Sequence, residues 1–195
     1  MRGAKRERIL RVILNKPDGT LTKYMVAKLS GSSIGWTIEY LQALERKKII
    51  KGTKVLDTGK AFNLWEKVAL KPQHFDFFVQ SPRDFLTGAG LDYAVTTYQA
   101  ENLLNHYLFV SRVDAYVRAD DLPKWKPLIA RNGLAGKGNL RLLIADEHVF
   151  YERQKVNGMW LVSRPQLLLD LRREGGVCRE AYDMMVAKDV RKKRN

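Results

Sequence analysis

The sequence is poor in the residues that build disulfides, metal sites and membrane spans. Its single cysteine, Cys178, cannot form an intrachain disulfide, and its three histidines lie far apart in no metal-ligand spacing. No run approaches the roughly 18 apolar residues that indicate a membrane span. The N-terminal stretch also lacks the apolar core of a signal peptide. These absences predict an intracellular, cytoplasmic protein that crosses no membrane and uses no metal or cofactor.

Acidic residues are scarce relative to basic ones: 21 Asp and Glu stand against 35 Lys and Arg, a formal net charge of +14. Residues 1–68 contain 15 basic and 6 acidic residues, residues 69–187 contain 15 and 14, and residues 188–195 contain 5 and 1. Charge clustered in this way is typical of proteins that bind a polyanion, most often nucleic acid. A basic surface that is merely solvated is the alternative.

The first third of the chain has the pattern of consecutive helices. Residues 4–14 place apolar side chains among basic ones at helical spacing, and residues 15–19 are a strong turn signal. Thr20 or Thr22 can cap a second helix, which runs to Leu29. The pattern therefore predicts two helices before the first glycine turn.

A third helix is expected after a tight turn at Gly31. Ser32 or Ser33 can cap it, because a serine oxygen accepts from the free N–H groups of the first turn. Apolar residues repeat on its expected core face: Ile38, Leu41 and Leu44. The opposite face is expected to carry Ser33, Trp36, Tyr40 and Lys47. Two helices with such an outer face predict a helix-turn-helix that reads the major groove. The alternative is a helical hairpin whose polar face is solvated.

Two short strands are expected next, over residues 49–56 and 61–65, around a turn at residues 57–60. Three helices followed by such a hairpin predict a winged helix, with Lys54 and Lys60 on the wing. Residues 26–50, VAKLSGSSIGWTIEYLQALERKKII, resemble the helix-turn-helix and first wing strand of winged helix-turn-helix regulators.

This arrangement yields ten candidate DNA-binding residues. Base edges and the nearby backbone are expected to meet Ser32, Ser33, Trp36, Thr37 and Tyr40. Phosphates are expected to be held by Thr22, Lys23, Lys47, Lys54 and Lys60. The basic tail, residues 188–195, is expected either to clamp a phosphate backbone or to remain a solvated terminus.

The rest of the chain divides into a connector and a second domain. Residues 69–90 are bounded by proline-containing turn signals and are expected to connect the domains, while residues 91–195 alternate between strand and helix patterns. Strands are expected at residues 93–95, 112–117, 139–145, 149–152 and 159–162. Helices are expected after Thr96 or Thr97, after Asp120 or Asp121, after Ser163 and at the C-terminal end. The predicted fold class is α+β, with a winged helix before a mixed-sheet domain.

Two short motifs of the second domain carry a further resemblance. The start Tyr93-Ala94-Val95-Thr96 and the stretch from Ser163 to Leu171 resemble the C-terminal domain of AbiEi-type antitoxins. Those antitoxins are winged-helix proteins of bacterial and archaeal type IV toxin–antitoxin systems. The resemblance implies a second domain similar to a nucleotidyltransferase fold that has lost its chemistry. It also implies repression of the protein's own promoter and neutralisation of a nucleotidyltransferase-type toxin.

An active nucleotidyltransferase that acts on RNA is the rival interpretation. It would need two or three carboxylates that hold Mg²⁺, and the candidates are Asp114 and Asp146. Asp114 stands alone on its expected strand without a preceding Gly-Ser turn, which favours a degenerate site. The glycine-rich segment 131–138 could cradle a phosphate, although a flexible loop is favoured. Cys178 lies near an expected helix start, which could lower its pKa, although a packing role is commoner.

The sequence therefore predicts a non-enzymatic regulator that binds double-stranded DNA in a sequence-specific way, as an antitoxin-like autorepressor. A homodimer on DNA and a toxin protein are its expected partners. A protein-docking module without specific DNA binding is the third possibility.

Overall fold

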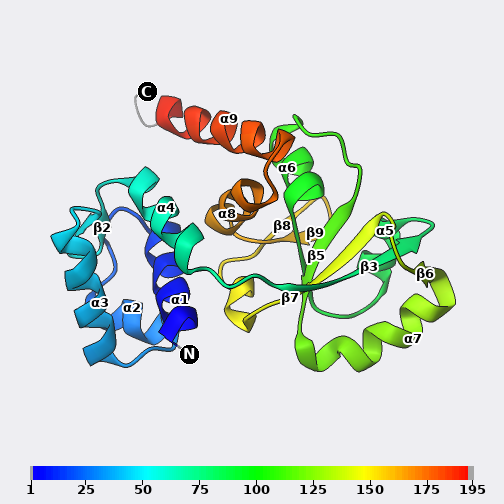
Figure 1. The fold of residues 1–195 in the computed structure, drawn as a ribbon, viewed down its shortest axis with the longest axis horizontal. Helices are drawn as coiled ribbons and strands as arrows, with labels where there is room; N and C mark the ends of the chain where they lie inside the picture. The colour runs from blue at the N-terminus through cyan, green and yellow to red at the C-terminus, as the bar shows by residue number, and fades with distance from the viewer. Residues whose placement is uncertain (1, 193–195) are drawn as a thin grey trace. The chain divides into compact units, whose positions relative to one another are not determined.

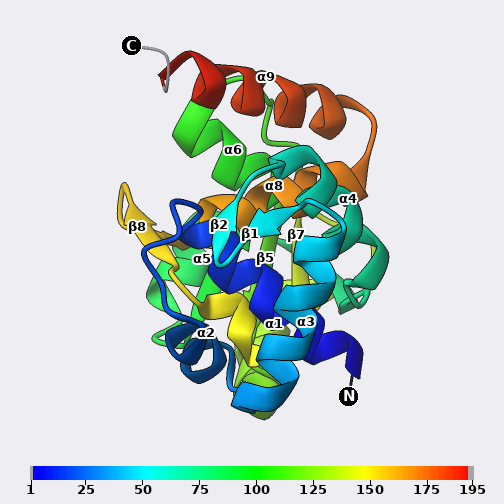
Figure 2. The same cartoon turned by 90° about the vertical axis from the view of Figure 1, so that its left-hand side faces the viewer.

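The computed structural model describes residues 2–192, and the chain divides into two compact units whose boundary lies between Leu70 and Lys71 (Figure 1). The first unit consists of α1 (Arg2–Asn15), α2 (Lys23–Ser30), α3 (Ile34–Arg46), β1 (Ile50–Lys51), β2 (Lys54–Val55) and α4 (Thr58–Val68). Helix α1 packs against α2 and α4, and α2 packs against α3. Figure 2 faces this unit and shows the hairpin of β1 and β2 that follows α3.

Local signals place the helix boundaries of the first unit. Of the two predicted caps, Thr22 is the one used: its hydroxyl accepts from the Met25 N–H at 3.1 Å. Gly31 ends α2 in the left-handed region, with φ 61°. Ser33 occupies the N-cap position of α3, but its side chain accepts no capping hydrogen bond. The predicted order of three helices and the Gly31 turn are confirmed.

The predicted hairpin is present with different strands. Its turn is at Gly52 and Thr53, and Lys51 pairs with Lys54 across it. The prediction of a strand at residues 61–65 is wrong, because these residues lie in α4. Asp57 caps that helix by accepting from the Lys60 N–H at 2.8 Å. Ala61, Phe62 and Trp65 are buried at helical spacing, so the apolar period there is that of a helix.

The second unit is built on a mixed seven-stranded sheet, and the α+β class is confirmed. Its strands are β3 (Gln73–Val79), β4 (Tyr93–Thr96), β5 (Val113–Val117), β6 (Gly133–Ala135), β7 (Leu140–Ile144), β8 (Gln154–Val156) and β9 (Met159–Leu161). The strand order is β6-β3-β7-β5-β4-β9-β8. The β5–β7 and β4–β9 pairs are parallel, whereas the other neighbours are antiparallel.

Helices cover this sheet at two places. They are α5 (Pro82–Gly88), α6 (Thr97–Asn105), α7 (Leu122–Asn132), α8 (Arg164–Glu174) and α9 (Val177–Lys192), with 3-10 turns η1 (Ala119–Asp121) and η2 (Glu147–Phe150). Helices α6, α8 and α9 pack on one another, and α6 packs on β4 and β5. Helix α7 packs on β3 and β6. The predicted helices that begin after Thr96, Asp121 and Ser163 are confirmed.

Two predictions for the second part of the chain are wrong. Residues 69–90 are not a connector, since β3 forms ladders with both β6 and β7 and α5 follows it. Residues 149–152 are not a strand: Asp146 accepts from the His148 N–H at 2.8 Å and begins the η2 turn there. Of the predicted basic tail, residues 193–195 lie outside the described residues.

Candidate nucleic-acid interface

Helix α3 turns inward a face that only partly matches the predicted one: Leu41 and Leu44 are buried as predicted, but Ile38 is only half-buried. Its buried residues are Thr37, Tyr40, Leu41 and Leu44, at spacings of three, one and three. The Thr37 hydroxyl donates to the Ser33 carbonyl at 2.9 Å, so it serves the helix itself. Tyr40 is 8% exposed, and burial raises the pKa of its phenol to about 12. Both side chains are thus turned into the unit, which does not favour the predicted contacts with base edges.

Trp36 lies beside Tyr40 rather than in open solvent. Their rings stack with centroids 6.5 Å apart, and the Arg6 guanidinium lies over both at 5.9 and 5.8 Å. This stack joins α3 to α1, because a cation over two aromatic faces is attracted to both. Trp36 is half-buried in this packing, and its indole nitrogen is buried without a hydrogen-bond partner in the described part of the chain. Trp36 thus helps to hold α3 against α1.

The outward face of α3 carries a set of residues that the sequence interpretation missed. The exposed positions follow one another at helical spacing: Gly35, Glu39, Gln42 and Arg46. Ile34, in the first turn, is 43% exposed. The sequence held a signal for this face, since it lies opposite the 37–40–41–44 stripe once Tyr40 and Thr37 are assigned to the core.

Side-chain contacts fix the hairpin next to α3. The Gly52 N–H donates to the Glu45 carboxylate at 2.6 Å, which ties the turn to the helix. On the other side, the Thr53 hydroxyl donates to the Leu21 carbonyl at 2.6 Å. Lys51 and Lys54 therefore project from a hairpin whose turn is anchored at both sides.

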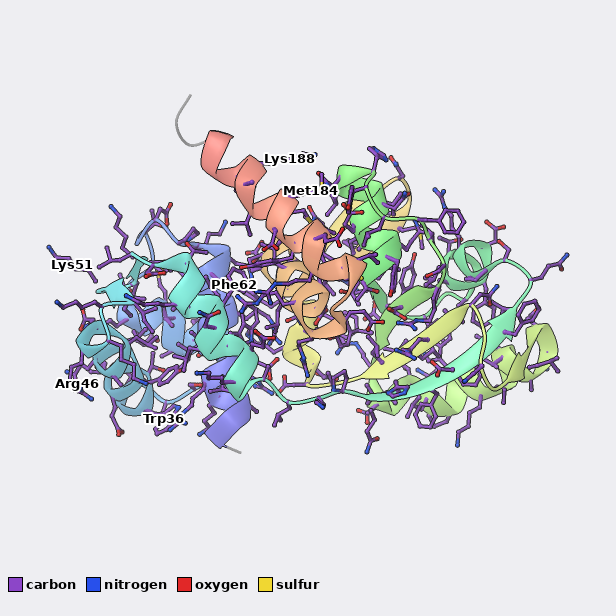
Figure 3. All side chains as sticks on the ribbon, turned by 45° about the horizontal axis from the view of Figure 1, so that its top comes forward. Trp36, Arg46, Lys51, Phe62, Met184 and Lys188 are labelled. Atoms are coloured by element: carbon purple, nitrogen blue, oxygen red, sulfur yellow. The ribbon has the colours of Figure 1, made fainter. Side chains whose placement is uncertain are left out.

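Six exposed cations lie on α3 and on the elements next to it in the chain. They come from α2, from the end of α3 and from the hairpin: Lys28, Arg46, Lys47, Lys48, Lys51 and Lys54. Figure 3 shows Arg46 and Trp36 at opposite ends of α3, with Lys51 on the hairpin. Among residues 2–192 none of these six side chains has an ion-pair partner. We call this set, together with the outward face of α3, the α3 surface.

The other predicted phosphate contacts are less favourably placed. Lys60 lies in the first turn of α4 instead of on the hairpin, and its ammonium is 3.3 Å from the Asp57 carboxylate. Lys23 is half-buried, and the Thr22 hydroxyl is engaged as the cap of α2. Ser32 is half-buried, whereas Ser33 is exposed. The structure therefore brings Ser33, Lys47 and Lys54 to the α3 surface but not Lys60.

The carboxylates of the rival interpretation are engaged in the second unit. Asp114 is 1% exposed; its carboxylate accepts from the Arg112 guanidinium at 2.5 and 3.0 Å and from the Thr97 hydroxyl. The same guanidinium also donates to Glu174 at 2.9 Å. Asp146 caps η2. Within residues 2–192 no three His, Cys, Asp or Glu side chains group in a way that could hold a metal ion.

Two other sequence candidates also have structural roles. In the glycine-rich segment, residues 133–135 form β6, and the Gly136 N–H donates to the Asp76 carbonyl at 3.0 Å. The segment is thus an edge of the sheet rather than a free phosphate cradle. Cys178 is fully buried, and burial raises the pKa of its thiol to about 11, opposite to the shift that a helix start suggests.

Comparison with protein-family models, with curated proteins and with solved structures found no match. In the described part of the chain, no helix combines the length and the apolar character that crossing a bilayer requires.

Proposed function

We propose that this protein binds double-stranded DNA through the α3 surface and acts as a transcriptional regulator. In this proposal α3 enters the major groove while α2 and the hairpin hold the flanking phosphates. The observation that carries it is the set of six exposed cations without ion-pair partners around one helix face. The order of helix, helix–turn–helix and hairpin supports the same interpretation.

Charge and geometry both favour DNA over a generic acidic partner. A duplex presents phosphates along both edges of a groove about 12 Å wide that admits an α-helix. The cations lie on elements that flank α3, so they can meet backbone phosphates while α3 lies between them. Neutralising several phosphates releases counterions, which supplies affinity independent of sequence.

The test is a selection of bound duplexes from a random pool, followed by titration at several salt concentrations. We expect one enriched sequence class and a log–log salt slope of about −0.9 for each phosphate neutralised. The variant Arg46→Ala/Lys51→Ala should weaken binding to every duplex. The matched control Arg131→Ala/Lys137→Ala removes the same charge from exposed positions of the second unit and should have little effect. Equal losses from the two double variants would reduce binding to a general charge effect and contradict the proposal.

For the second unit we propose the antitoxin-like role that the resemblance implies, namely binding a nucleotidyltransferase-type toxin. One observation favours a protein partner there: Phe109, in the loop after α6, is 86% exposed. A large exposed apolar side chain is a common anchor at protein interfaces. Co-expression with a toxin encoded by a neighbouring gene tests this role. Wild type should restore growth and Phe109→Ser should restore it less; equal rescue would remove Phe109 from the interface.

An active nucleotidyltransferase receives less support from the same contacts. The Asp114 carboxylate, which would have to ligate Mg²⁺, already accepts from the Arg112 guanidinium and the Thr97 hydroxyl. We therefore propose no catalytic step for this chain.

A further inference from the structure

No contact or backbone conformation within the described chain requires a glycine at position 35 of the α3 surface. It is the second residue of α3, it is exposed, and a Cβ built on it would meet nothing within 4 Å. Its backbone is helical, so no left-handed conformation requires a glycine there. Glycine weakens a helix relative to alanine because it loses more backbone freedom on folding. Neither packing nor conformation within the described chain accounts for it.

A glycine at such a position permits close approach of the backbone to a partner. Gly35 lies in the first turn of α3, which is the part of a recognition helix that usually meets base edges. Its neighbours on the surface are the 43% exposed Ile34 and, one turn later, the exposed Glu39. A branched apolar side chain can pack on the C5-methyl group of thymine, and a glutamate can accept from the cytosine amino group.

We propose that Ile34, Gly35 and Glu39 form the base-reading part of the α3 surface. The missing side chain at Gly35 lets the first turn approach the groove floor. At that depth Ile34 covers a thymine methyl group and Glu39 accepts from a nearby cytosine. This inference rests on the proposed DNA binding and specifies its target: a major-groove site with a thymine and a cytosine within the reach of one helix turn.

The chain provides a matched control for a substitution at Gly35. Gly59 is likewise the second residue of a helix in the same unit, is likewise exposed, and its added Cβ would meet only the Asp57 carboxylate, at an ordinary 3.5 Å. Gly35→Ala and Gly59→Ala should both raise the melting temperature slightly. Only Gly35→Ala should weaken binding to the selected cognate duplex, by about tenfold or more, the factor for one lost base contact.

Affinity for a scrambled duplex should stay unchanged in both variants, because the phosphate contacts remain. Cognate affinity of Gly35→Ala equal to that of wild type would overturn the base-reading inference and leave DNA binding intact. Failure of the wild type to bind any duplex would overturn the proposed function and this inference together. Loss of binding to a protein partner with unchanged DNA binding would reassign the face to protein docking and overturn the inference.

A second measurement tests the thymine contact on the DNA side. Deoxyuridine in place of each thymine of the cognate site removes one methyl group. At the position under Ile34, wild type should lose about fourfold in affinity, the factor for one buried methyl-sized group. The variant Ile34→Ala should be insensitive to the same replacement, and Glu39→Gln should relax the preference for one cytosine. If wild type and Ile34→Ala respond alike at every thymine, Ile34 reads no methyl group.

Discussion

Both units contain ion pairs, such as the buried Arg11–Glu7 pair of the first unit, and the contrast lies between the α3 surface and the guanidinium groups of the second unit. In the first unit, six exposed cations of the α3 surface have no ion-pair partner among the described residues. In the second unit, guanidinium groups are paired: Arg112 with Asp114 and Glu174, and Arg118 with Asp92 and Glu147. Paired charges stabilise a fold, whereas unpaired ones on one surface remain available to a partner. Under the proposed function, the unpaired cations of the α3 surface are available to DNA phosphates, whereas these guanidinium groups of the second unit pair with carboxylates of the same unit.

The largest effect should follow from breaking the most buried pair of the second unit. Asp114→Asn removes one of the two carboxylates that pair with Arg112, so only Glu174 remains to balance the charge of the guanidinium. Breaking a buried pair on one side costs about 3 kcal/mol or more. We expect a loss of this size in the free energy of unfolding of the second unit, measured by urea denaturation followed by circular dichroism.

A half-exposed pair of the same unit provides the control. The Arg164–Asp189 pair is exposed by more than a third on both sides, so Asp189→Asn should change the free energy of unfolding by at most about 1 kcal/mol. Neither variant should alter DNA affinity while the protein is folded. A loss of DNA affinity in folded Asp114→Asn would contradict the proposal that DNA binding depends on the first unit alone.

The next effect concerns the buried Asp170, whose carboxylate has three polar partners; burial raises its pKa, and the positive charge of Arg173 lowers it in part. Its carboxylate accepts from Thr96 at 2.7 Å, from Tyr116 at 3.0 Å and from Gln166 at 2.9 Å. Burial raises the pKa of Asp170 to about 6, above the ordinary value of 3.8. Because the folded state holds the proton more tightly, its stabilising contribution is complete below pH 4 and is lost as the pH rises through about 6.

The variant Asp170→Asn isolates this contribution because it stays neutral. Between pH 4 and pH 8, wild type should lose roughly 2 to 3 kcal/mol of stability relative to the variant, from the cited pKa difference. The measurement is the difference between the two unfolding free energies at each pH, so the other carboxylates cancel. A difference that does not change with pH would show that Asp170 ionises in the fold as readily as in the unfolded chain.

A smaller effect on DNA binding compares an unpaired lysine of the first unit with a paired one. Lys54 is unpaired on the hairpin, whereas Lys60 lies on α4 beside Asp57. Lys54→Ala should weaken binding to all duplexes alike and reduce the magnitude of the salt slope by about one. Lys60→Ala should leave both quantities unchanged. Equal behaviour of the two variants would show that unpaired charge does not define the α3 surface.

The sequence predicted the elements whose signals are local. The Thr22 cap, the left-handed Gly31 and the helix that begins after Ser163 depend on a few neighbouring residues, and all three are confirmed. Strand β3 was missed because its partners β6 and β7 lie more than 50 residues away, and its apolar run between two prolines also suits a packed connector.

The burial of Thr37 and Tyr40 on α3 was missed for a different physical reason. Threonine, tyrosine and tryptophan have both apolar and polar atoms, so their type does not decide between core and surface. The contact that turns these aromatic side chains inward comes from α1, whose Arg6 guanidinium packs over Trp36 and Tyr40. That contact joins segments 30 residues apart, so the pattern of apolar residues within α3 cannot predict it. Of the residues that the sequence assigned to the outer face of α3, Thr37 and Tyr40 are therefore buried, whereas Ser33 and Lys47 are exposed.

The smallest expected effect, that of Tyr40→Phe, tests most directly whether Tyr40 faces the inside of the unit. The Tyr40 hydroxyl is buried without a hydrogen-bond partner in the described chain. Removing an unsatisfied buried hydroxyl is nearly neutral or slightly stabilising, by about 1 kcal/mol at most. Tyr40→Phe should therefore keep or raise the melting temperature and leave the preference for the cognate duplex unchanged.

Glu39, the preceding residue, points to the exposed side of the same helix. Glu39→Gln should change the selected DNA sequence with little change in stability, because exposed substitutions usually alter stability by at most about 0.5 kcal/mol. Paired selections with the two variants decide between the faces. If Tyr40→Phe altered the selected sequence and Glu39→Gln did not, the phenol would have to leave its stack to reach a base. The inward assignment of Tyr40 would then hold only for the free protein, and the DNA-bound helix would present the face that the sequence first indicated.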